Sequence, residues 1–435
     1  MPETATRRIR WPRRPRLEML LLGLVAGVGL TLLAGLVVVP LFAGDDGIED
    51  GELVILSGRD EGQGNQRQAL VDQWNALHPR NPARIEEIAA GADAQRSEMV
   101  ARAQGGGKGD ADVYNLDVTW TAEFASRGYI RDLDGADTTG YLPAPLQTCR
   151  YDGHLWALPF NTDAGLLYYR DKLAPQAPKG WTQLVASVQQ ALGRPGAPAA
   201  GYAGQLADYE GLTVNALEAI WAAGGDVVDP HGNVVIDSPE ARAGLTRLAT
   251  GLTAGTPQVI LPDSLGFDEL GTTQAFAAGR VLFMRNWPVA HRALDPPSAG
   301  DSAKALDFAV TRLPGPSALG GQNLAIAAHS RRPRAARALI EFLTGERSQQ
   351  ILFERGGFAA TREIVYRDAE VIQRYRYAPT LLEAIRDART RPVTPHYAQF
   401  SETFRALVRQ ALADGGHLPP DAKPRLEAAL QGYKR

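Results

Sequence analysis

The chain contains little cysteine and none of the familiar catalytic motifs. Cys149 is the only cysteine in 435 residues, so no disulfide can form within the chain, and we expect its thiol to be buried as a small hydrophobic group. The seven histidines are scattered without an H-E-x-x-H pattern, and no G-x-S-x-G elbow is present. We therefore predict no catalytic residue, no metal, no cofactor and no enzymatic activity.

The glycine-rich segments also lack the features of phosphate-binding loops. Residues 105–109 include a lysine, but Gly109 follows it where a P-loop has Ser or Thr. Gly62 and Gly64 form G-x-G without the third glycine of a dinucleotide-binding fingerprint. A net charge of −3 gives no electrostatic footprint for nucleic acid. The glycine-rich segments therefore indicate flexible connections. The net charge leads us to expect no nucleic-acid partner.

The N-terminus, in contrast, is strongly patterned. Arginines crowd residues 1–18, and an uncharged, mostly apolar run follows from Met19 to Gly44. At about 1.5 Å per residue this run is longer as a helix than the ~30 Å core of a bilayer. Arginines keep their own side of a membrane span cytoplasmic. The pattern predicts a cytoplasmic stub over 1–18, a transmembrane anchor or uncleaved signal over 19–44, and an extracellular remainder at the cell membrane.

Cleavage of this segment is the alternative. The apolar region of a signal peptide usually has only ~7–15 residues, and Leu41 fits poorly at the −3 position of a small-x-small cleavage site before Gly44. A lipid-anchored form would need a cysteine just after the run, and none is there. We therefore expect a retained single-pass anchor, with the rest of the chain exposed to external solutes and without access to cytoplasmic ATP or NAD.

The chain beyond Asp45 is globular in composition and long enough for two domains. Its first part alternates strand and helix patterns, which predicts a parallel α/β sheet. These patterns are strands at 53–56, 84–88 and 112–116, with helices at 70–77 and 92–104. Further strands are expected at 166–169, 281–284, 308–310 and 324–327, with helices from Trp181, Glu210 and Pro239 and mostly helices after Pro333. The absence of a long linker predicts two domains connected by several crossings.

Aromatic and polar residues gather near the expected strand ends, where ligands of open α/β sheets bind. They are Asp117, Trp120, Asn161, Asp163, Tyr209, Glu210, Trp287, Gly321, Gln322, Asn323 and Arg391. A sugar ring has an apolar face that stacks on aromatic rings, and hydroxyls that need donors and acceptors. Each residue alone also has an ordinary structural explanation, such as core packing for a tryptophan or a favourable helix-start position for a carboxylate. Their joint occurrence favours carbohydrate binding.

Several motifs occur together in a characteristic order. They are Leu53–Gly58, Asn115–Ala125, Ala157–Arg170, Tyr209–Thr213, Met284–Pro288 and Gly320–Ile326. The chain from Gly51 onward thereby resembles the family 1 extracellular solute-binding proteins of sugar ABC importers, nearest the trehalose/maltose-binding branch. The resemblance implies an α/β, two-lobed periplasmic-binding-protein-like fold with a hinge and a central cleft.

The resemblance also implies domain boundaries and site residues. Lobe 1 would comprise residues 51–160 plus about 286–335, and lobe 2 about 161–285 plus 336–435. The pocket would include Glu61, Asp117, Asn161 or Asp163, and Glu210. Trp287 would stack on a sugar ring, Gly321 would donate from its backbone, and Arg391 would clamp hydroxyls. We count Trp120, Tyr209, Gln322 and Asn323 as further ligand-binding candidates.

Three positions depart from the family pattern. Gln322 stands where a tryptophan is frequent after the Gly-Gly pair, and Val289 stands where an aromatic residue often follows Asn-Trp-Pro. Asn161 also occupies a position where an aromatic residue is common. The loss of three stacking surfaces indicates a ligand smaller or more polar than a disaccharide, or a pocket with altered use.

The leading hypothesis is a monomeric, membrane-tethered binding protein that captures a mono- or oligosaccharide and delivers it to the permease of an ABC importer. A membrane-anchored sugar sensor or scaffold without a transport role is an alternative, because a retained span would suit signalling through a partner helix. A glycoside hydrolase with paired carboxylates is a further alternative, since Glu61, Asp117, Asp163 and Glu210 supply more carboxyl groups than such an enzyme needs.

Overall fold

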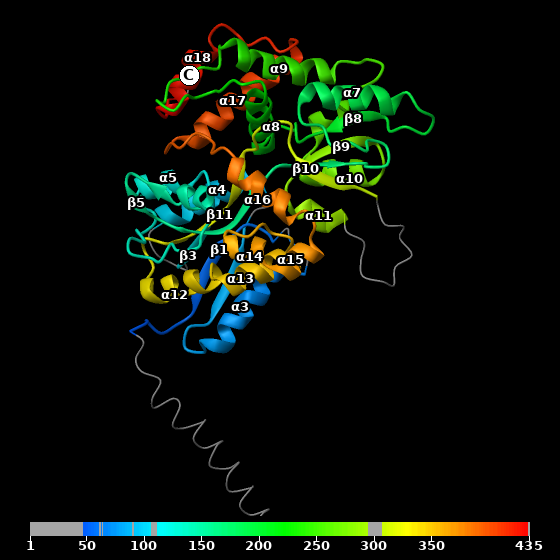
Figure 1. Ribbon diagram of the computed structural model, residues 1–435. Coiled ribbons are helices and arrows are strands. Elements are labelled where there is room, and N and C mark those ends of the chain that lie inside the picture. The colour runs from blue at the N-terminus through cyan, green and yellow to red at the C-terminus, as the bar shows by residue number, and fades with distance from the viewer. Residues whose placement is uncertain are drawn as a thin grey trace, which may run out of the picture. The chain divides into compact units, whose positions relative to one another are not determined.

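The computed structural model describes residues 47–60, 62, 64–88, 91–105, 111–294 and 307–433 (Figure 1). Two compact units divide the chain, Met1–Ile48 and Glu49–Arg435, and every element below belongs to the second. The predicted stub and membrane span, Glu61 and most of the glycine-rich segment lie outside the described residues. Among the helices of the described ranges, none combines the length and the apolar character needed to span a bilayer.

The first sheet has five strands in the order β2-β1-β3-β11-β6. Their bounds are β1 Leu53–Ser57, β2 Ala83–Glu87, β3 Val113–Asp117, β6 Leu158–Ala164 and β11 Leu319–Ile326. β1 pairs in parallel with β2 and β3, which confirms the predicted β-α-β-α-β unit. β11 runs antiparallel to both of its neighbours. The sheet is therefore mixed and not purely parallel as expected, because β11, which comes much later in the chain, runs antiparallel to β3 and β6.

The helices of this unit begin and end close to the predicted positions. α3 covers Gln66–Leu77 and stops before Pro79, which cannot continue a helix, and α4 covers Ala92–Gln104. Trp74 anchors α3, since its ring is buried and its Nε1 donates to the Asn81 carbonyl at 2.7 Å. Smaller elements follow β3: α5 Thr121–Ser126, α6 Pro143–Thr148, and a hairpin of β4 Arg150–Tyr151 and β5 His154–Leu155.

Cys149 lies in this first lobe and is fully buried, as expected. Burial raises the pKa of its thiol well above the usual range. The thiol is therefore a neutral part of the core.

The second sheet has four strands in the order β10-β7-β9-β8. Their bounds are β7 Leu166–Tyr169, β8 Ala200–Ala203, β9 Val281–Asn286 and β10 Ala309–Arg312. Its helices are α7 Trp181–Leu192, α8 Glu210–Ala222, α9 Pro239–Leu252, α10 Glu269–Ala277 and α11 Val289–Leu294, with a short turn of 3-10 helix at Pro262–Gly266. The predicted start of α9 is confirmed, because Ser238 Oγ accepts the Ala241 N–H at 3.2 Å and Pro239 is the first helical residue.

Helices dominate the last hundred residues, as predicted. They are α12 Pro333–Leu343, α13 Glu346–Ile351, a π-helical turn η3 at Leu352–Gly356, α14 Glu363–Arg367, α15 Ala369–Arg374, α16 Ala378–Asp387, α17 Tyr397–Ala413 and α18 Ala422–Leu430. α12 packs on β11, β6 and α3 of the first sheet. α17 packs on α8, α9 and α18 (Figure 1). Phe400, Phe404 and Leu407 of α17 are buried in the core that these helices share.

The chain passes between the two sheets three times, at residues 164–166, 313–318 and 388–396. The three segments are bonded to one another. Gly165 N donates to Ser317 Oγ at 2.5 Å, and Arg389 N donates to the Ser317 carbonyl at 2.8 Å. Leu319 N in turn donates to the Arg389 carbonyl at 2.8 Å. The predicted multiple crossings thus form one hydrogen-bonded connection.

A buried ion pair lies against these crossings. Arg285 donates to both carboxylate oxygens of Glu218, at 2.7 and 2.9 Å, and Glu218 Oε1 also accepts the Ala318 N–H at 3.1 Å. A Cβ on Gly165 would stand 2.8 Å from the Arg285 guanidinium, so the crossing needs glycine there for lack of space. The pair thereby holds the crossing at Ala318 by a hydrogen bond and the crossing at Gly165 by close packing.

The predicted lobe ranges assign two segments to the wrong sheet. β10 pairs with β7 of the second sheet, although 286–335 was assigned to lobe 1. α12 packs on the first sheet, although 336–435 was assigned to lobe 2. Both differences follow from where the chain crosses. The second crossing comes after β10, so β10 stays with the second sheet, and the third crossing comes only at 388–396, so α12 stays with the first sheet.

Candidate ligand-binding site

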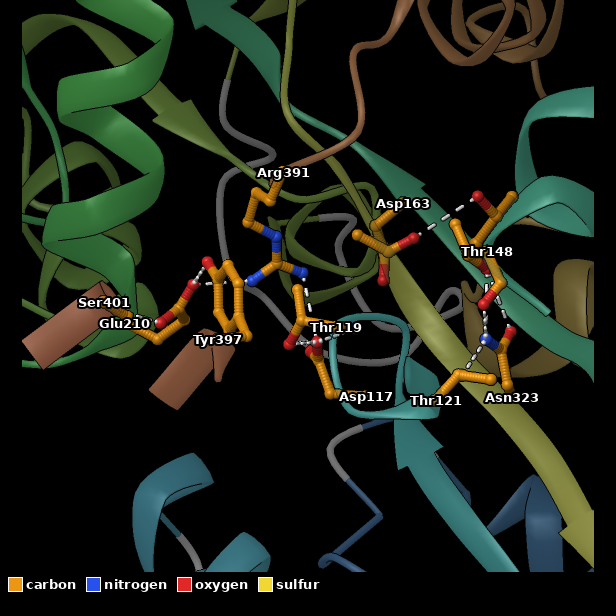
Figure 2. Close-up of polar contacts among 12 residues, drawn as sticks. Asp117, Thr119, Thr121, Thr148, Asp163, Glu210, Asn323, Arg391, Tyr397 and Ser401 are labelled. Atoms are coloured by element: carbon orange, nitrogen blue, oxygen red, sulfur yellow. Dashed lines mark hydrogen bonds and ion pairs between the residues drawn. The ribbon is translucent and has the colours of Figure 1, made fainter. Parts of the chain in front are cut away.

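Arg391 lies between carboxylates from the two lobes. It belongs to the third crossing, and its side chain is only 3% exposed. Its Nη1 donates to Glu210 Oε1 at 2.7 Å, and its Nη2 donates to Asp117 Oδ1 at 3.2 Å (Figure 2). Asp117 ends β3 of the first sheet, and Glu210 is the first residue of α8 on the second. One guanidinium therefore joins the carboxyl end of a strand to the start of a helix in the other lobe.

Glu210 is held by α17 as well as by Arg391. Tyr397 donates its hydroxyl to Glu210 Oε1 at 2.5 Å, and Ser401 donates to Oε2 at 2.6 Å. Burial raises the pKa of Tyr397 well above its usual value, and the Glu210 charge adds to the effect. The tyrosine hydroxyl is therefore a fixed donor, and its spacing of four residues puts it on the same helix face as Ser401.

Asp117 is oriented by its own turn. Its Oδ1 accepts both the backbone N–H of Thr119 at 2.9 Å and the Thr119 hydroxyl at 2.7 Å. This is the Asx-type turn that aspartate favours after a strand. The Asp117 side chain remains 23% exposed, more than Glu210 or Arg391. Asp117 is thus the member of the ion-paired group with most access to solvent and to a ligand.

Two buried polar atoms near this group have no hydrogen-bond partner among the described residues. They are the Nε donor of Arg391 and the Oδ1 acceptor of Asn161. Leaving a buried polar atom unpaired costs about 1–3 kcal/mol, so such atoms usually meet a partner. A ligand hydroxyl can accept from the first and donate to the second.

Trp287 follows β9 and is partly buried. Its indole Nε1 donates to Glu269 Oε1 at 3.1 Å, and the Arg285 guanidinium stacks on its ring at 3.7 Å. Tyr209 donates its hydroxyl to the other oxygen of Glu269 at 2.7 Å. Glu269 therefore fixes both aromatic candidates, and Arg285 occupies part of the stacking surface of Trp287.

The β6 and β11 candidates lie next to Trp287. Asn161 Nδ2 donates to Asp163 Oδ2 at 3.4 Å. A Cβ on Gly320 would stand 3.2 Å from Asp163 and 3.4 Å from the Trp287 ring. Gly321 has φ +118°, and a Cβ there would be 2.2 Å from the Asn161 carbonyl, so only glycine fits. The double glycine therefore allows these strands and the indole to approach closely.

Other predicted residues are placed differently. Trp120 is buried and is the N-cap residue of α5, so its ring contributes to the core. Asn323 is fully buried, and its side chain bonds to Thr121 and Thr148 within the first lobe (Figure 2). Gln322 is partly exposed, and its Oε1 accepts from Arg67 at 3.2 Å. Glu61 lies outside the described residues. Trp120 and Asn323 are thus buried within the first lobe, and their role in ligand binding stays a prediction.

Four residues that support the site are absent from the ligand-binding candidates predicted from the sequence. They are Arg67, Glu269, Tyr397 and Ser401. The helical spacing of Tyr397 and Ser401 was a usable signal, since both are polar on the otherwise apolar face of α17. The partners of Arg67 and Glu269 are remote in sequence, and no local pattern indicates them.

The chain matches known proteins over most of its length. The family described as bacterial extracellular solute-binding protein matches residues 69–379. A probable ABC transporter-binding protein of Deinococcus radiodurans is 30% identical over 381 residues, which is 84% of this chain and 89% of that protein.

Solved structures agree with this match. The maltose-bound MalE3 of T. maritima is 29% identical with a TM-score of 0.78, over 88% of this chain and 99% of that one. The GacH receptor of Streptomyces glaucescens has the same fold at 23% identity and a TM-score of 0.74, over 89% and 100% of the two chains. The two-lobed periplasmic-binding-protein-like fold is thereby confirmed, and the predicted absence of enzymatic activity agrees with a family of binding proteins. The chain belongs to the bacterial extracellular solute-binding proteins.

Proposed function

We propose that this protein captures a carbohydrate outside the cell and delivers it to the permease of an ABC importer. The observation that carries the proposal is the bridge from Arg391 to Asp117 and Glu210, which draws on both lobes at the carboxyl end of β3. The maltose in the T. maritima relative and the transporter-binding name of the D. radiodurans relative support the same conclusion.

Binding would act by stabilising the closed arrangement of the lobes. A ligand that contacts both lobes binds the closed state more tightly than the open one and shifts the population toward it. Ligand hydroxyls would accept from Arg391 Nε and donate to Asn161 Oδ1, both of which are buried atoms without a hydrogen-bond partner among the described residues. The exposed part of Asp117 would accept from a further hydroxyl, and Trp287 would contact the apolar face of the ring.

The ligand would be smaller or more polar than a disaccharide. Asn161, Val289 and Gln322 replace aromatic residues of the resembling family, and Arg285 already stacks on Trp287. Aromatic stacking area is what holds the second ring of a disaccharide, so a monosaccharide or a polyol suits the remaining surface better.

The N-terminal segment 19–44 would keep the protein at the membrane, next to the permease. A fixed receptor meets its permease at a high effective concentration, whereas a cleaved one would diffuse. We propose one copy of the chain per site, because Arg391 joins Asp117 of one lobe to Glu210 of the other within the same chain.

Isothermal calorimetry of the full-length protein in mild detergent, against a panel of uncharged mono- and oligosaccharides, tests the proposal. We expect saturable one-site binding of at least one small sugar, together with a rise in the melting temperature, since a ligand stabilises the state it binds. Folded protein that shows no heat of binding with any sugar of the panel would overturn carbohydrate capture.

A further inference from the structure

Glu269 joins two aromatic side chains that come from different parts of the second lobe. Its Oε2 accepts the Tyr209 hydroxyl at 2.7 Å, and its Oε1 accepts the Trp287 indole N–H at 3.1 Å. Tyr209 precedes α8, Trp287 follows β9, and Glu269 is the first residue of α10. Hydrogen bonds to an ionised carboxylate are stronger than those between neutral groups, so both rings are held by charge-assisted bonds.

The backbone around this carboxylate is fixed as well. Asp268 caps α10, since its Oδ1 accepts the Gly271 N–H at 2.8 Å. Asn286 is fully buried, and its Nδ2 donates to the Glu269 carbonyl at 3.0 Å while its Oδ1 accepts the Trp287 N–H at 2.8 Å. The position of Glu269 relative to Trp287 is therefore set twice, once through the main chain and once through the side chain.

The indole of Trp287 offers only part of its surface to a solute. The Arg285 guanidinium lies over one face, 3.7 Å from the ring centre. A Cβ on Gly320 would stand 3.4 Å from the benzene edge of the indole, so β11 lies against that edge. Glu269 occupies the Nε1 edge. These contacts leave the opposite face for a sugar, and the tilt of that face depends on the bond to Glu269.

Tyr209 connects this carboxylate to the Arg391 group. It is the N-cap residue of α8 and directly precedes Glu210, to which Arg391 donates. A Cβ on Gly211 would stand 2.3 Å from the Tyr209 ring, so the ring lies directly against the first turn of α8. Burial, together with the Glu269 charge, raises the pKa of Tyr209 well above its usual value, so its hydroxyl remains a donor. Glu269 therefore links the stacking surface to the polar group at the start of α8.

We propose that Glu269 is a positioning residue that makes the cleft select ring-shaped sugars over open-chain polyols. The proposal rests on the proposed function and narrows its solute class to a pyranose. A pyranose has a preformed apolar face that fits a fixed indole, whereas a polyol has none and loses rotational freedom when it binds. An indole that turns freely presents the same area without the fixed geometry, and it gives up this preference.

The test uses calorimetry of the full-length protein. The probes are glucose, galactose and mannose, each compared with the polyol obtained by reducing it. We expect at least about tenfold tighter binding of one hexose than of its polyol to the wild type. Glu269→Ala should weaken the binding of that hexose at least about tenfold and change the binding of the polyol by less than about threefold.

A double-mutant cycle with Trp287→Ala separates positioning from direct contact with the solute. Because Glu269 acts through the indole, Glu269→Ala should cause less than about twofold further loss in a Trp287→Ala background. Glu269→Gln should largely restore hexose binding, since its amide oxygen can accept from the indole and its amide nitrogen can donate to the Tyr209 hydroxyl. The matched control, Glu240→Ala, changes an exposed glutamate in the first turn of α9 and should alter neither affinity.

Near-ultraviolet circular dichroism checks the position of Trp287 without a solute. The spectrum of the protein minus that of Trp287→Phe isolates the signal of this indole. The difference should shrink in a Glu269→Ala background and persist with Glu269→Gln, because a mobile indole loses its asymmetric surroundings. Trp287→Phe also removes the bond to Glu269 from the other side, so it should lose most of the preference for the hexose even where Glu269→Ala does not fold.

Each failure has a distinct meaning. Equal binding of hexose and polyol to the wild type, unchanged hexose affinity or an unchanged difference spectrum in Glu269→Ala, or additive losses in the cycle would each overturn the positioning role. Binding of a hexose to the wild type in those cases would leave the proposed function standing. If folded wild-type protein binds neither these probes nor any sugar of the uncharged panel, the proposed function fails and the selectivity fails with it.

Discussion

The Arg391 group and the Arg285–Glu218 pair are two buried arginine ion pairs with different exposure. Arg391 bonds to carboxylates of both lobes, and Asp117 in this group keeps 23% of its side chain exposed. Arg285 and Glu218 are only 1% and 8% exposed, and Glu218 also accepts the Ala318 N–H of the second crossing. A charged group that stays open to solvent can meet a ligand, whereas an enclosed pair mainly holds the chain in place. The comparison indicates that exposure separates an arginine group that binds a solute from one that fixes the crossings.

Removal of Arg391 should have the largest effect. Arg391→Met leaves Asp117 and Glu210 as two uncompensated carboxylates, and breaking a buried ion pair costs about 3–5 kcal/mol. We expect sugar affinity to fall more than about a hundredfold in calorimetry, with a lower melting temperature. Arg391→Lys is the matched variant that keeps the charge and loses the fork of two donors, and it should bind more weakly than wild type but better than Arg391→Met. Unchanged sugar affinity in Arg391→Met would show that the paired group is not part of the site.

The Arg285–Glu218 pair should show the reverse pattern. Glu218→Gln leaves the Arg285 charge buried without its carboxylate, and breaking a buried ion pair costs about 3–5 kcal/mol. We expect a clearly lower melting temperature and a smaller loss of sugar affinity than in Arg391→Met. Thermal unfolding and calorimetry measure the two effects. A loss of sugar affinity as large as in Arg391→Met, without a lower melting temperature, would mean that the pair belongs to the binding site.

A smaller change should sharpen the role of the paired region. Ser401→Ala removes the hydroxyl that donates to Glu210 Oε2 at 2.6 Å, and one such bond is worth about 1 kcal/mol. We expect sugar affinity to fall about fivefold, as measured by titration calorimetry. Ser126→Ala is a suitable control, since that hydroxyl donates to a backbone carbonyl in α5 and contacts no residue of the site. Equal effects of the two changes would argue against positioning of Glu210 by α17.

A change of ionic strength should have the smallest effect. Raising the salt from about 0.1 to 1 M shortens the Debye length from about 10 to 3 Å, so exposed charges are screened much more than buried pairs. The affinity for an uncharged hexose should therefore change by less than about twofold, because Arg391 and Glu210 are largely buried. Titrations in chloride salts measure this affinity, and a several-fold loss would contradict binding through buried ion pairs.

Local patterns predicted most of the fold, because each signal lies within a few residues. Ser238-Pro239 marks the start of α9, Pro79 follows the end of α3, and the alternating elements before Asp117 form the parallel unit. The direction of β11 and the sheet of β10 were not predictable this way. The direction of β11 and the sheet that β10 joins both depend on the positions at which the chain crosses between the lobes, and no local sequence pattern marks these positions.

The site was predictable only in part. The ligand motifs located Asp117, Glu210 and Arg391, which the structure brings together from 274 positions apart in the chain. The burial of Trp120 and Asn323 was not predictable, because strand-end residues of these types occur in sites and in cores alike and tertiary packing decides their exposure. Glu269 was missed because its partners, Tyr209 and Trp287, lie on other elements.

Titration calorimetry of uncharged monosaccharides into full-length wild-type protein and into Arg391→Met tests the central claim most directly. The account predicts one-site binding of a small sugar to the wild type, and at least a hundredfold weaker binding or none to a folded Arg391→Met variant. Equal affinity of both proteins for that sugar, or folded wild-type protein that binds no sugar, would contradict it.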